Sequence, residues 1–231
     1  MPQRALSGFA RRERKLPQSP VDRGTVQERV YRRIRELILN GEVEPGQTLT
    51  IQGLSEAFRV SAMPVREALR RLMAEQALTV VAGRSVGIPP LSRARLLDLR
   101  RVRREVEALA VAWAAARITQ AELARMAGLL ERMQRAAEIR NGRSYVPANH
   151  DFHFGVYRAA NSPTLLSIIE SLWLQIGPYF HVLRASDNWQ AANSTHRDML
   201  QALARRDPAA AAAALRRDID GAALALEALL D

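Results

Sequence analysis

Three arginines recur at helical spacing in segment 61–75, opposite a row of apolar side chains. Arg66, Arg70 and Arg71 fall on one side of a predicted helix. The other side repeats apolar residues at i, i+3, i+4 and i+7, namely Val65, Ala68, Leu69 and Leu72. A guanidinium can donate two parallel hydrogen bonds to the edge of a guanine, so this face suits a DNA major groove. The alternative is an amphipathic helix whose arginines are simply solvated.

Two histidines, an asparagine and an aspartate are spaced so that a helical fold can bring them together. Asn149 and His153 are four residues apart and therefore share one helix face. His196 lies 11 residues before Asp207, and Asp218 lies 11 residues after it. An antiparallel helix pair that turns near Asp207 places these two side chains at the same height. Such a group can bind a divalent metal, or it can form a hydrogen-bonded polar pocket without metal.

Local signals place the arginines on the second helix of a helix-turn-helix. Ser61 can accept hydrogen bonds from the free N–H groups of the first turn, where Pro64 is tolerated because those groups lack intrahelical partners. We expect Glu67 to pair with Arg71, one turn further on. A shorter helix over residues 51–58 precedes the turn and can pack on the second helix.

Flanking segments complete a winged domain, which we expect to span residues 25–90. A preceding helix is predicted for residues 26–40, with apolar residues on one side. After the helix pair, residues 78–82 and 86–88 are typical of two short strands around Gly83-Arg84-Ser85. The result is a small wing with an arginine at its tip.

This order of elements resembles the DNA-binding domain of the GntR-type (gluconate-repressor-type) bacterial transcription regulators. The residues that carry the resemblance are Leu54-Ser55-Glu56 and the long run Ser61-x-x-Pro64-Val65-Arg66-Glu67-Ala68-Leu69-Arg70-Arg71-Leu72. The resemblance implies that Arg66 contacts bases, that Ser61 meets a phosphate and that Arg84 is the wing arginine. We also expect Thr50, which can cap the second helix, to lie at the DNA.

Several positions depart from the common pattern of this family. Ala62 and Met63 stand where relatives often have an arginine and a threonine. Gln52 stands where relatives often have an arginine. Alanine cannot donate a hydrogen bond to guanine, so at least one usual base contact is missing. Either the operator differs from that of better-known relatives, or Arg70 or Gln52 compensates.

Charge and composition agree with a nucleic-acid partner. The chain has 34 basic and 24 acidic residues. Residues 1–92 hold 15 basic and 9 acidic residues, and the remaining residues hold 19 basic and 15 acidic ones, so positive charge is denser in the first part. We expect residues 1–24 to form a disordered basic arm. The chain has no cysteine, and it has no apolar run of the roughly 20 residues that cross a bilayer. We therefore expect a cytoplasmic protein without disulfides or membrane contact.

After the Pro89-Pro90 link, from residue 91 onward, the sequence has no strand pattern, and its apolar residues recur at helical spacing. We expect the pair Asn141-Gly142 to stop one of the helices. The predicted helices cover residues 93–117, 120–139, 144–160, 163–184, 189–206 and 208–230. The predicted fold class is thus mostly α, with a winged helix-turn-helix domain followed by an all-helical bundle.

The predicted bundle resembles the FCD effector domain of the fatty-acid-regulator (FadR) subfamily. The matching residues are Arg103-x-x-x-Glu107, Phe152-His153, Asn161-Ser162-Pro163 and Thr195-His196-Arg197. The resemblance implies that residues 91–231 bind a small carboxylate effector and dimerise. Arg103 matches an arginine that can fork onto a carboxylate, and its alternative partner is Glu107 on the same helix. Both roles can coexist until a ligand displaces the pair.

Many FCD domains hold a divalent metal with one aspartate and three histidines. By motif, the four positions here are Asn149, His153, His196 and Asp218. The usual aspartate is replaced by Asn149 and the last histidine by Asp218. The site therefore still has four candidate ligands and one negatively charged side chain. Asparagine is a poor ligand for zinc. The two readings, a Zn, Ni or Mn type ion and a metal-free polar pocket, both stay open.

Taken together, these patterns predict a ligand-responsive, sequence-specific DNA-binding transcription regulator that acts as a homodimeric repressor. A metal-dependent hydrolase or lyase is a weaker hypothesis, because it leaves the winged domain unexplained. A nucleoid-type DNA binder without effector would explain the charge but not the buried polar cluster. We therefore expect no enzymatic activity.

Overall fold

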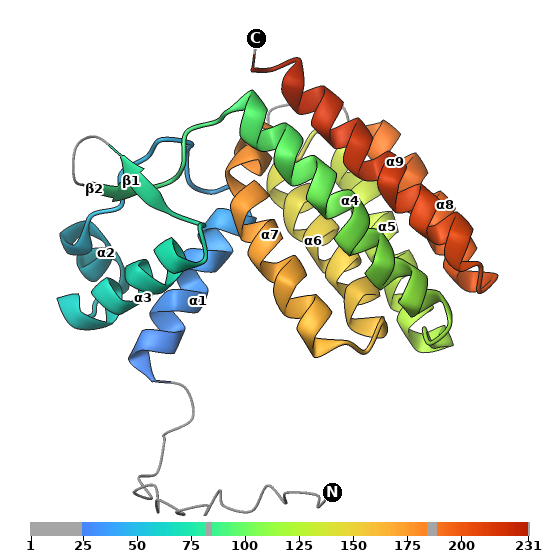
Figure 1. Ribbon diagram of the computed structural model, residues 1–231, viewed down its shortest axis with the longest axis horizontal. Coiled ribbons are helices and arrows are strands. Elements are labelled where there is room, and N and C mark those ends of the chain that lie inside the picture. The colour runs from blue at the N-terminus through green and yellow to red at the C-terminus, as the bar shows by residue number, and fades with distance from the viewer. Residues whose placement is uncertain (1–24, 82–84, 184–188, 231) are drawn as a thin grey trace, which may run out of the picture.

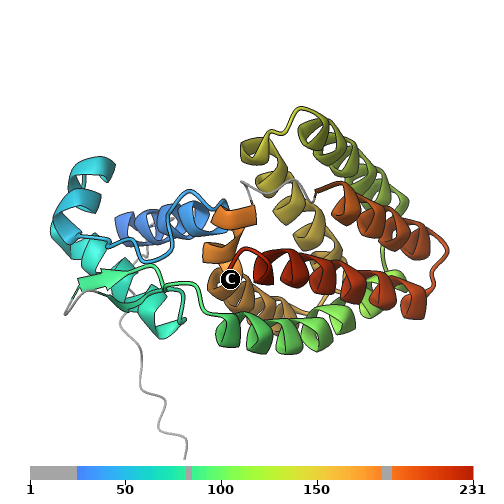
Figure 2. The same ribbon diagram turned by 90° about the horizontal axis from the view of Figure 1, so that it is seen from above.

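The computed structural model describes residues 25–81, 85–183 and 189–230. The expected basic arm and Arg84 lie outside the described residues. The chain forms a small N-terminal unit beside a larger helical bundle (Figure 1). Figure 2 shows the same two units side by side when they are viewed from above.

The N-terminal unit is a winged helix-turn-helix. It contains α1 (Val26–Leu39), α2 (Ile51–Phe58), α3 (Ala62–Ala74), β1 (Thr79–Val81) and β2 (Ser85–Gly87). The two strands are antiparallel, with Val80 opposite Val86. The predicted apolar row of α3 is buried against α1 and α2, which forms the core of this unit.

Local capping explains where α2 begins and ends. The side chain of Thr50 accepts a hydrogen bond from the Gly53 N–H at 3.0 Å. Arg59 ends the helix in the left-handed region with φ 54°, a conformation that glycine adopts most readily.

Two details of α3 differ from the prediction. Ser61 occupies the N-cap position, but its side chain makes no capping hydrogen bond. Glu67 pairs with Arg70 at 3.1 Å rather than with Arg71. Arg71 instead reaches back to α1, where it pairs with Glu28 at 3.0 Å and lies 3.6 Å from the ring centre of Tyr31. The prediction missed this because it considered only partners within the same helix.

The remaining elements form an all-helical bundle, which confirms the predicted fold class. Its helices are α4 (Arg93–Ala115), α5 (Gln120–Glu138), α6 (Gly142–Ala159), α7 (Pro163–Leu183), α8 (Trp189–Ala204) and α9 (Pro208–Glu227). Helix α9 packs along both α4 and α8, and α5 packs along α6 (Figure 1).

The turn between α5 and α6 corrects one boundary. Asn141 was expected to stop a helix together with Gly142, but its side chain instead caps α6 by accepting from the Ser144 N–H at 3.1 Å. The stop is provided by Arg140, which adopts a left-handed conformation with φ 50°. Asn141 serves as a cap because its short side chain competes well for a free backbone N–H.

The two units meet where the end of α1 packs on α7. Gly41 lies so close to α7 that an added Cβ would stand 2.8 Å from the backbone nitrogen of His181. The ring of His181 is 3.1 Å from the carbonyl oxygen of Gly41. Arg35 of α1 pairs with Glu170 of α7 at 3.4 Å. The winged unit is therefore in direct contact with one helix of the bundle.

Candidate functional site

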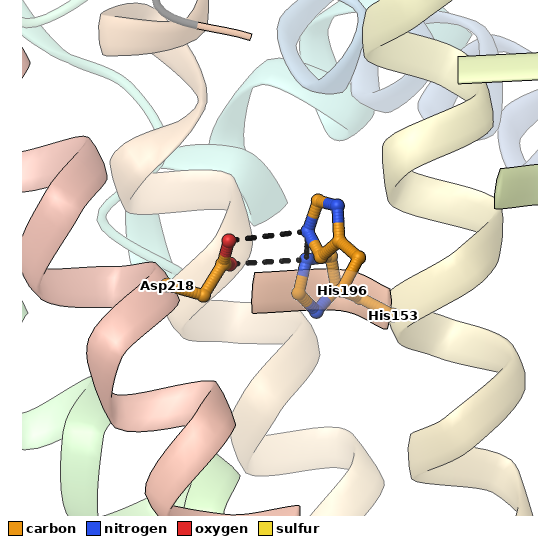
Figure 3. A group of neighbouring side chains, drawn as sticks. All are labelled: His153, His196 and Asp218. Atoms are coloured by element: carbon orange, nitrogen blue, oxygen red, sulfur yellow. Dashed lines mark hydrogen bonds and ion pairs between the residues drawn. The ribbon is translucent and has the colours of Figure 1, made fainter. Parts of the chain in front are cut away.

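Three side chains from three helices converge inside the bundle. His153 on α6, His196 on α8 and Asp218 on α9 each offer a ligand atom, and these atoms lie within 4.8 Å of one another. Figure 3 shows both rings directed at the Asp218 carboxylate. Nε2 of His153 is 3.4 Å from Oδ2 of Asp218, and Nε2 of His196 is 3.2 Å from Oδ1. The two Nε2 atoms are 3.1 Å apart.

The hairpin of α8 and α9 brings His196 and Asp218 together. Asp207 caps α9 by accepting from the Ala210 N–H, so the chain reverses at that residue. The Thr195 hydroxyl lies 2.8 Å from Oδ1 of Asp218 and 2.7 Å from the carbonyl oxygen of Ala192, and it can donate its single proton to either. Asn149 lies one turn before His153 and lines the same cavity as His153 and Asp218.

A chain of buried hydrogen bonds joins the triad to Arg103. The Tyr157 hydroxyl donates to Oε2 of Glu107 at 2.5 Å and lies 3.2 Å from Nδ1 of His153. Glu107 in turn accepts from Nε of Arg103 at 2.6 Å. The expected pair of Arg103 and Glu107 is therefore present, and it is buried. Tyr157 was not among the expected site residues.

This chain sets the tautomer of His153. A carboxylate can only accept, so the Tyr157 hydroxyl donates to Glu107 and its oxygen accepts from the Nδ1–H of His153. A neutral His153 then carries its lone pair on Nε2, which faces His196 and Asp218. Orientation of a histidine through its other ring nitrogen is common among metal ligands.

The protonation states favour cation binding. Burial lowers the pKa of His153, and the nearby Asp218 opposes this only in part. Burial also raises the pKa of Asp218, but opposing interactions, of which the largest is with His196, hold that pKa well below its usual value. A neutral imidazole and an ionised carboxylate are the forms that coordinate metal.

Two observations test whether a cation fits here. The Nε2 lone pair of His153 and Oδ2 of Asp218 are both acceptors, and they lie 3.4 Å apart. Ligands held at about 2.0–2.2 Å from a tetrahedral ion lie roughly 3.3–3.6 Å apart. The observed separations of 3.1–3.4 Å are close to this spacing. The three side chains therefore fit a small divalent ion.

A cavity of about 130 Å³ opens beside the triad. Its polar lining includes Arg103, Asn149 and Asp218, and aromatic side chains such as Trp173 and Phe180 form much of its wall. Glu107 takes the Nε and Nη2 sides of the Arg103 guanidinium, which leaves the Nη1 side for a ligand. The cavity is thus lined both by the Arg103 guanidinium and by residues of the candidate metal site.

The other expected site residues lie on the winged unit. Ser61, Arg66 and Arg70 on or beside α3 are exposed, as are Thr50 and Gln52 at the start of α2. Gln52 donates to Glu56 at 3.0 Å, and Arg70 pairs with Glu67. The roles of these residues at DNA stay predictions.

The histidines outside the triad have structural surroundings of their own. His150 stacks on Phe154 with ring centres 4.3 Å apart. His181 contacts Gly41 at the junction of the two units, a role that no local pattern in the sequence signals.

The tryptophans differ in burial. Trp173 and Trp189 are buried, whereas Trp113 on α4 is exposed.

Comparisons with known proteins agree with this architecture. Residues 26–88 match the family described as bacterial regulatory proteins, gntR family, and residues 98–221 match the FCD domain. The chain is 35% identical over 148 residues to the HTH-type transcriptional regulator McbR of Escherichia coli (strain K12), covering 64% of this chain and 67% of McbR. It is 26% identical over 198 residues to the HTH-type transcriptional repressor GlaR of the same organism, covering 82% and 90%.

Solved structures give the same result. The structure described as E. coli McbR/YncC superimposes with a TM-score of 0.85 at 27% identity, covering 90% of this chain and 100% of that one. A putative GntR regulator from Rhodococcus sp. RHA1 shares the fold with a TM-score of 0.73 at 22% identity, covering 87% and 97%. Within the described residues, no helix is long and apolar enough to cross a membrane.

These relatives are transcription regulators rather than enzymes, which confirms the predicted class of function. The two matched regions follow one another in the order that the structure shows, a winged DNA-binding unit and then a helical bundle. The chain therefore belongs to the gntR family of bacterial regulatory proteins and carries an FCD domain behind its DNA-binding domain.

Proposed function

We propose that this protein is a homodimeric repressor of the FadR subfamily that releases its operator when a small carboxylate binds in the bundle. The proposal assigns DNA binding to residues 25–90, effector binding and dimerisation to residues 91–231, and an auxiliary basic arm to residues 1–24. It places the protein in the cytoplasm, where its operator is found. The observation that carries it is the buried chain from Arg103 through Glu107 and Tyr157 to His153.

The cavity is suited to an organic anion. A ligand carboxylate can accept from the Nη1 side of Arg103, in the strong charge-assisted geometry that arginine favours. A divalent ion held by His153, His196 and Asp218, with Asn149 as a further oxygen donor, would supply a second positive centre for the same anion. Trp173 and Phe180 exclude water from the remainder of the ligand.

Helix α7 offers a route from the cavity to the DNA-binding unit. Trp173 and Phe180 line the cavity, and the next residue, His181, contacts Gly41 at the end of α1. A ligand that prefers one position of α7 thereby favours one orientation of the winged unit. Operator affinity falls if that orientation differs from the DNA-bound one, because the ligand shifts the population between two states.

The test is DNase footprinting of the full chain on the DNA upstream of its own gene, with and without a panel of carboxylic acids. We expect a protected near-palindrome whose protection one class of acid abolishes. Protection of random DNA to the same extent would instead support a nucleoid-type binder. Operator binding that no acid changes would contradict the effector part of the proposal.

Arg66→Ala tests the recognition helix. The exposed guanidinium is expected to donate to a guanine, a contact worth about 1–3 kcal/mol of discrimination per half-site. Gel shifts should therefore show weaker binding to the operator and little change on scrambled DNA. Arg101→Ala is the matched control, because it removes the same charge from an exposed arginine on α4. Equal effects of the two substitutions would contradict the assignment.

A further inference from the structure

The first turn of α3 presents an apolar tip. Ala62 and Met63 are both exposed, and Met63 retains 62% of its accessible surface. The next two residues, Pro64 and Val65, are buried in the core of the winged unit. Their burial fixes the start of the helix, so Met63 is held on its outer surface.

The polar side chains that could replace the missing base contacts are already engaged. Gln52 donates to Glu56 on its own helix at 3.0 Å. Arg70 pairs with Glu67 on its own helix at 3.1 Å. Across the described ranges of the chain, Arg66 has no ion-pair partner. The exposed N-terminal part of α3 therefore presents the thioether side chain of Met63 and, one turn later, the guanidinium of Arg66.

These two groups match different bases. In the major groove, guanine, adenine and cytosine present hydrogen-bonding groups, whereas thymine also presents a C5 methyl group. A methionine placed against a polar edge leaves that edge unsatisfied, which is costly once water is excluded. Placed against the methyl group, it buries apolar surface on both sides.

The spacing of the two side chains sets the spacing of the two bases. Residues three apart on a helix are separated by about 4.5 Å along its axis. Successive base pairs rise by about 3.4 Å. Met63 and Arg66 therefore address base pairs about one step apart.

We propose that Met63 selects a thymine in each operator half-site by contact with its C5 methyl group, at the base pair next to the guanine that Arg66 reads. This inference rests on the proposed function and adds the chemistry of the DNA sequence that is bound. It corresponds to the first alternative left by the sequence, a different operator, and requires no compensation by Gln52 or Arg70.

The experiment begins with selection of operator DNA from a randomised pool by the full-length protein. The consensus should contain a thymine adjacent to a guanine in each half-site. That thymine is then replaced by deoxyuridine, which removes only the methyl group and keeps every hydrogen-bonding atom. Affinity should fall about fourfold per half-site, the factor that corresponds to about 0.8 kcal/mol for one buried methyl group.

Two substitutions at Met63 identify the side chain that senses the methyl group. Met63→Gln has a similar length but a polar end, and it should bind thymine and deoxyuridine operators equally. Met63→Leu is the matched apolar control and should keep the difference. Arg66→Ala should also keep it while losing the preference for guanine. Because positions 63 and 66 are both exposed, all three variants should melt like the wild type.

The outcomes separate this inference from the function on which it rests. A wild-type protein that selects no consensus contradicts sequence-specific regulation itself. A clear consensus with no thymine beside the guanine overturns the Met63 assignment alone. Equal affinity of the wild type for thymine and deoxyuridine operators, or a methyl preference that persists in Met63→Gln, overturns it as well.

Discussion

At the scale of single residues, the bundle buries a pair of opposite charges. Arg103 and Glu107 are both buried, and an isolated buried charge would cost several kcal/mol. Each is compensated by the other, and Glu107 also accepts from Tyr157. Apolar residues of similar size would give the bundle comparable stability without this network. Its presence next to a cavity therefore points to ligand binding.

The candidate metal ligands give a prediction at this scale. His153→Ala and His196→Ala should each lose bound metal, because they remove a nitrogen ligand. A ligand that binds only the folded state adds about 2.7 kcal/mol at a hundredfold excess over its dissociation constant. Chelation should thus lower the melting temperature of the wild type but not of these variants. His150→Ala is the control, because His150 lies on the same helix but stacks on Phe154.

The two departures from the family ligand set should act in opposite directions. Asn149→Asp should tighten metal binding, because it adds an anionic oxygen beside His153. Asp218→Asn should weaken it, because it removes the carboxylate that faces both imidazoles. Elemental analysis of untagged protein is the measurement. Substoichiometric metal in the wild type and in Asn149→Asp, with no effect of chelator on melting, would leave only the metal-free pocket.

At the scale of elements, α7 contacts both the cavity of the bundle and the winged unit. Its Trp173 and Phe180 line the cavity, and its C-terminal turn packs on the end of α1. Gly177 also lies against α1, where an added Cβ would stand 2.7 Å from a methyl carbon of Ile38. Such close backbone contact between packed elements transmits small shifts, because packed interfaces deform little.

Two glycines allow a matched test of this junction. Gly41 and Gly46 both have positive φ, of 61° and 79°, and alanine in that region costs about 1–2 kcal/mol. An added Cβ at Gly46 meets nothing within 4 Å, whereas at Gly41 it collides with the backbone of α7. Gly41→Ala should therefore destabilise the protein more than Gly46→Ala in urea unfolding. It should also weaken the response of operator binding to the effector, and equal behaviour of the two variants would argue against coupling through this contact.

At the scale of the whole molecule, the part of the chain that the structure describes contains one helix-turn-helix, which can read only half of a palindromic site. Helix α4 lies on an outer face of the bundle (Figures 1 and 2). Along it, Val102, Leu109 and Trp113 are each more than 40% exposed, and half-buried Val106 completes one stripe. In an antiparallel pair of α4 helices, Val102 faces Trp113 and Val106 faces Leu109 of a second copy. The stripe is thus self-complementary, as a twofold interface requires.

The stripe predicts which substitution would disrupt the proposed dimer. Leu109→Glu introduces a charge at its centre, so the full-length chain should sediment as a monomer and bind its operator more weakly. Leu224→Glu places the same charge on an exposed leucine of α9, outside the stripe, and should leave the dimer intact. A Leu109→Glu protein that remains dimeric would move the interface to another surface.

The sequence by itself determined the helices, the cap of α2 and the family. Helix periodicity and the hydrogen bond by which Thr50 caps α2 depend on neighbours within a few residues, so they can be read locally. The position of the turn at Asp207 was enough to bring His196 opposite Asp218. The basic chemistry of α3 was likewise evident, because exposed and buried faces follow from the helical repeat alone.

Only the tertiary structure decided which long-range partners these side chains take. Arg71 pairs with Glu28 of another helix, and Tyr157 links His153 to Glu107 from positions 46 residues apart in the chain. His181 meets Gly41 across 140 residues. Such contacts depend on how helices pack, and packing is set by the combined shape of many side chains rather than by any local pattern.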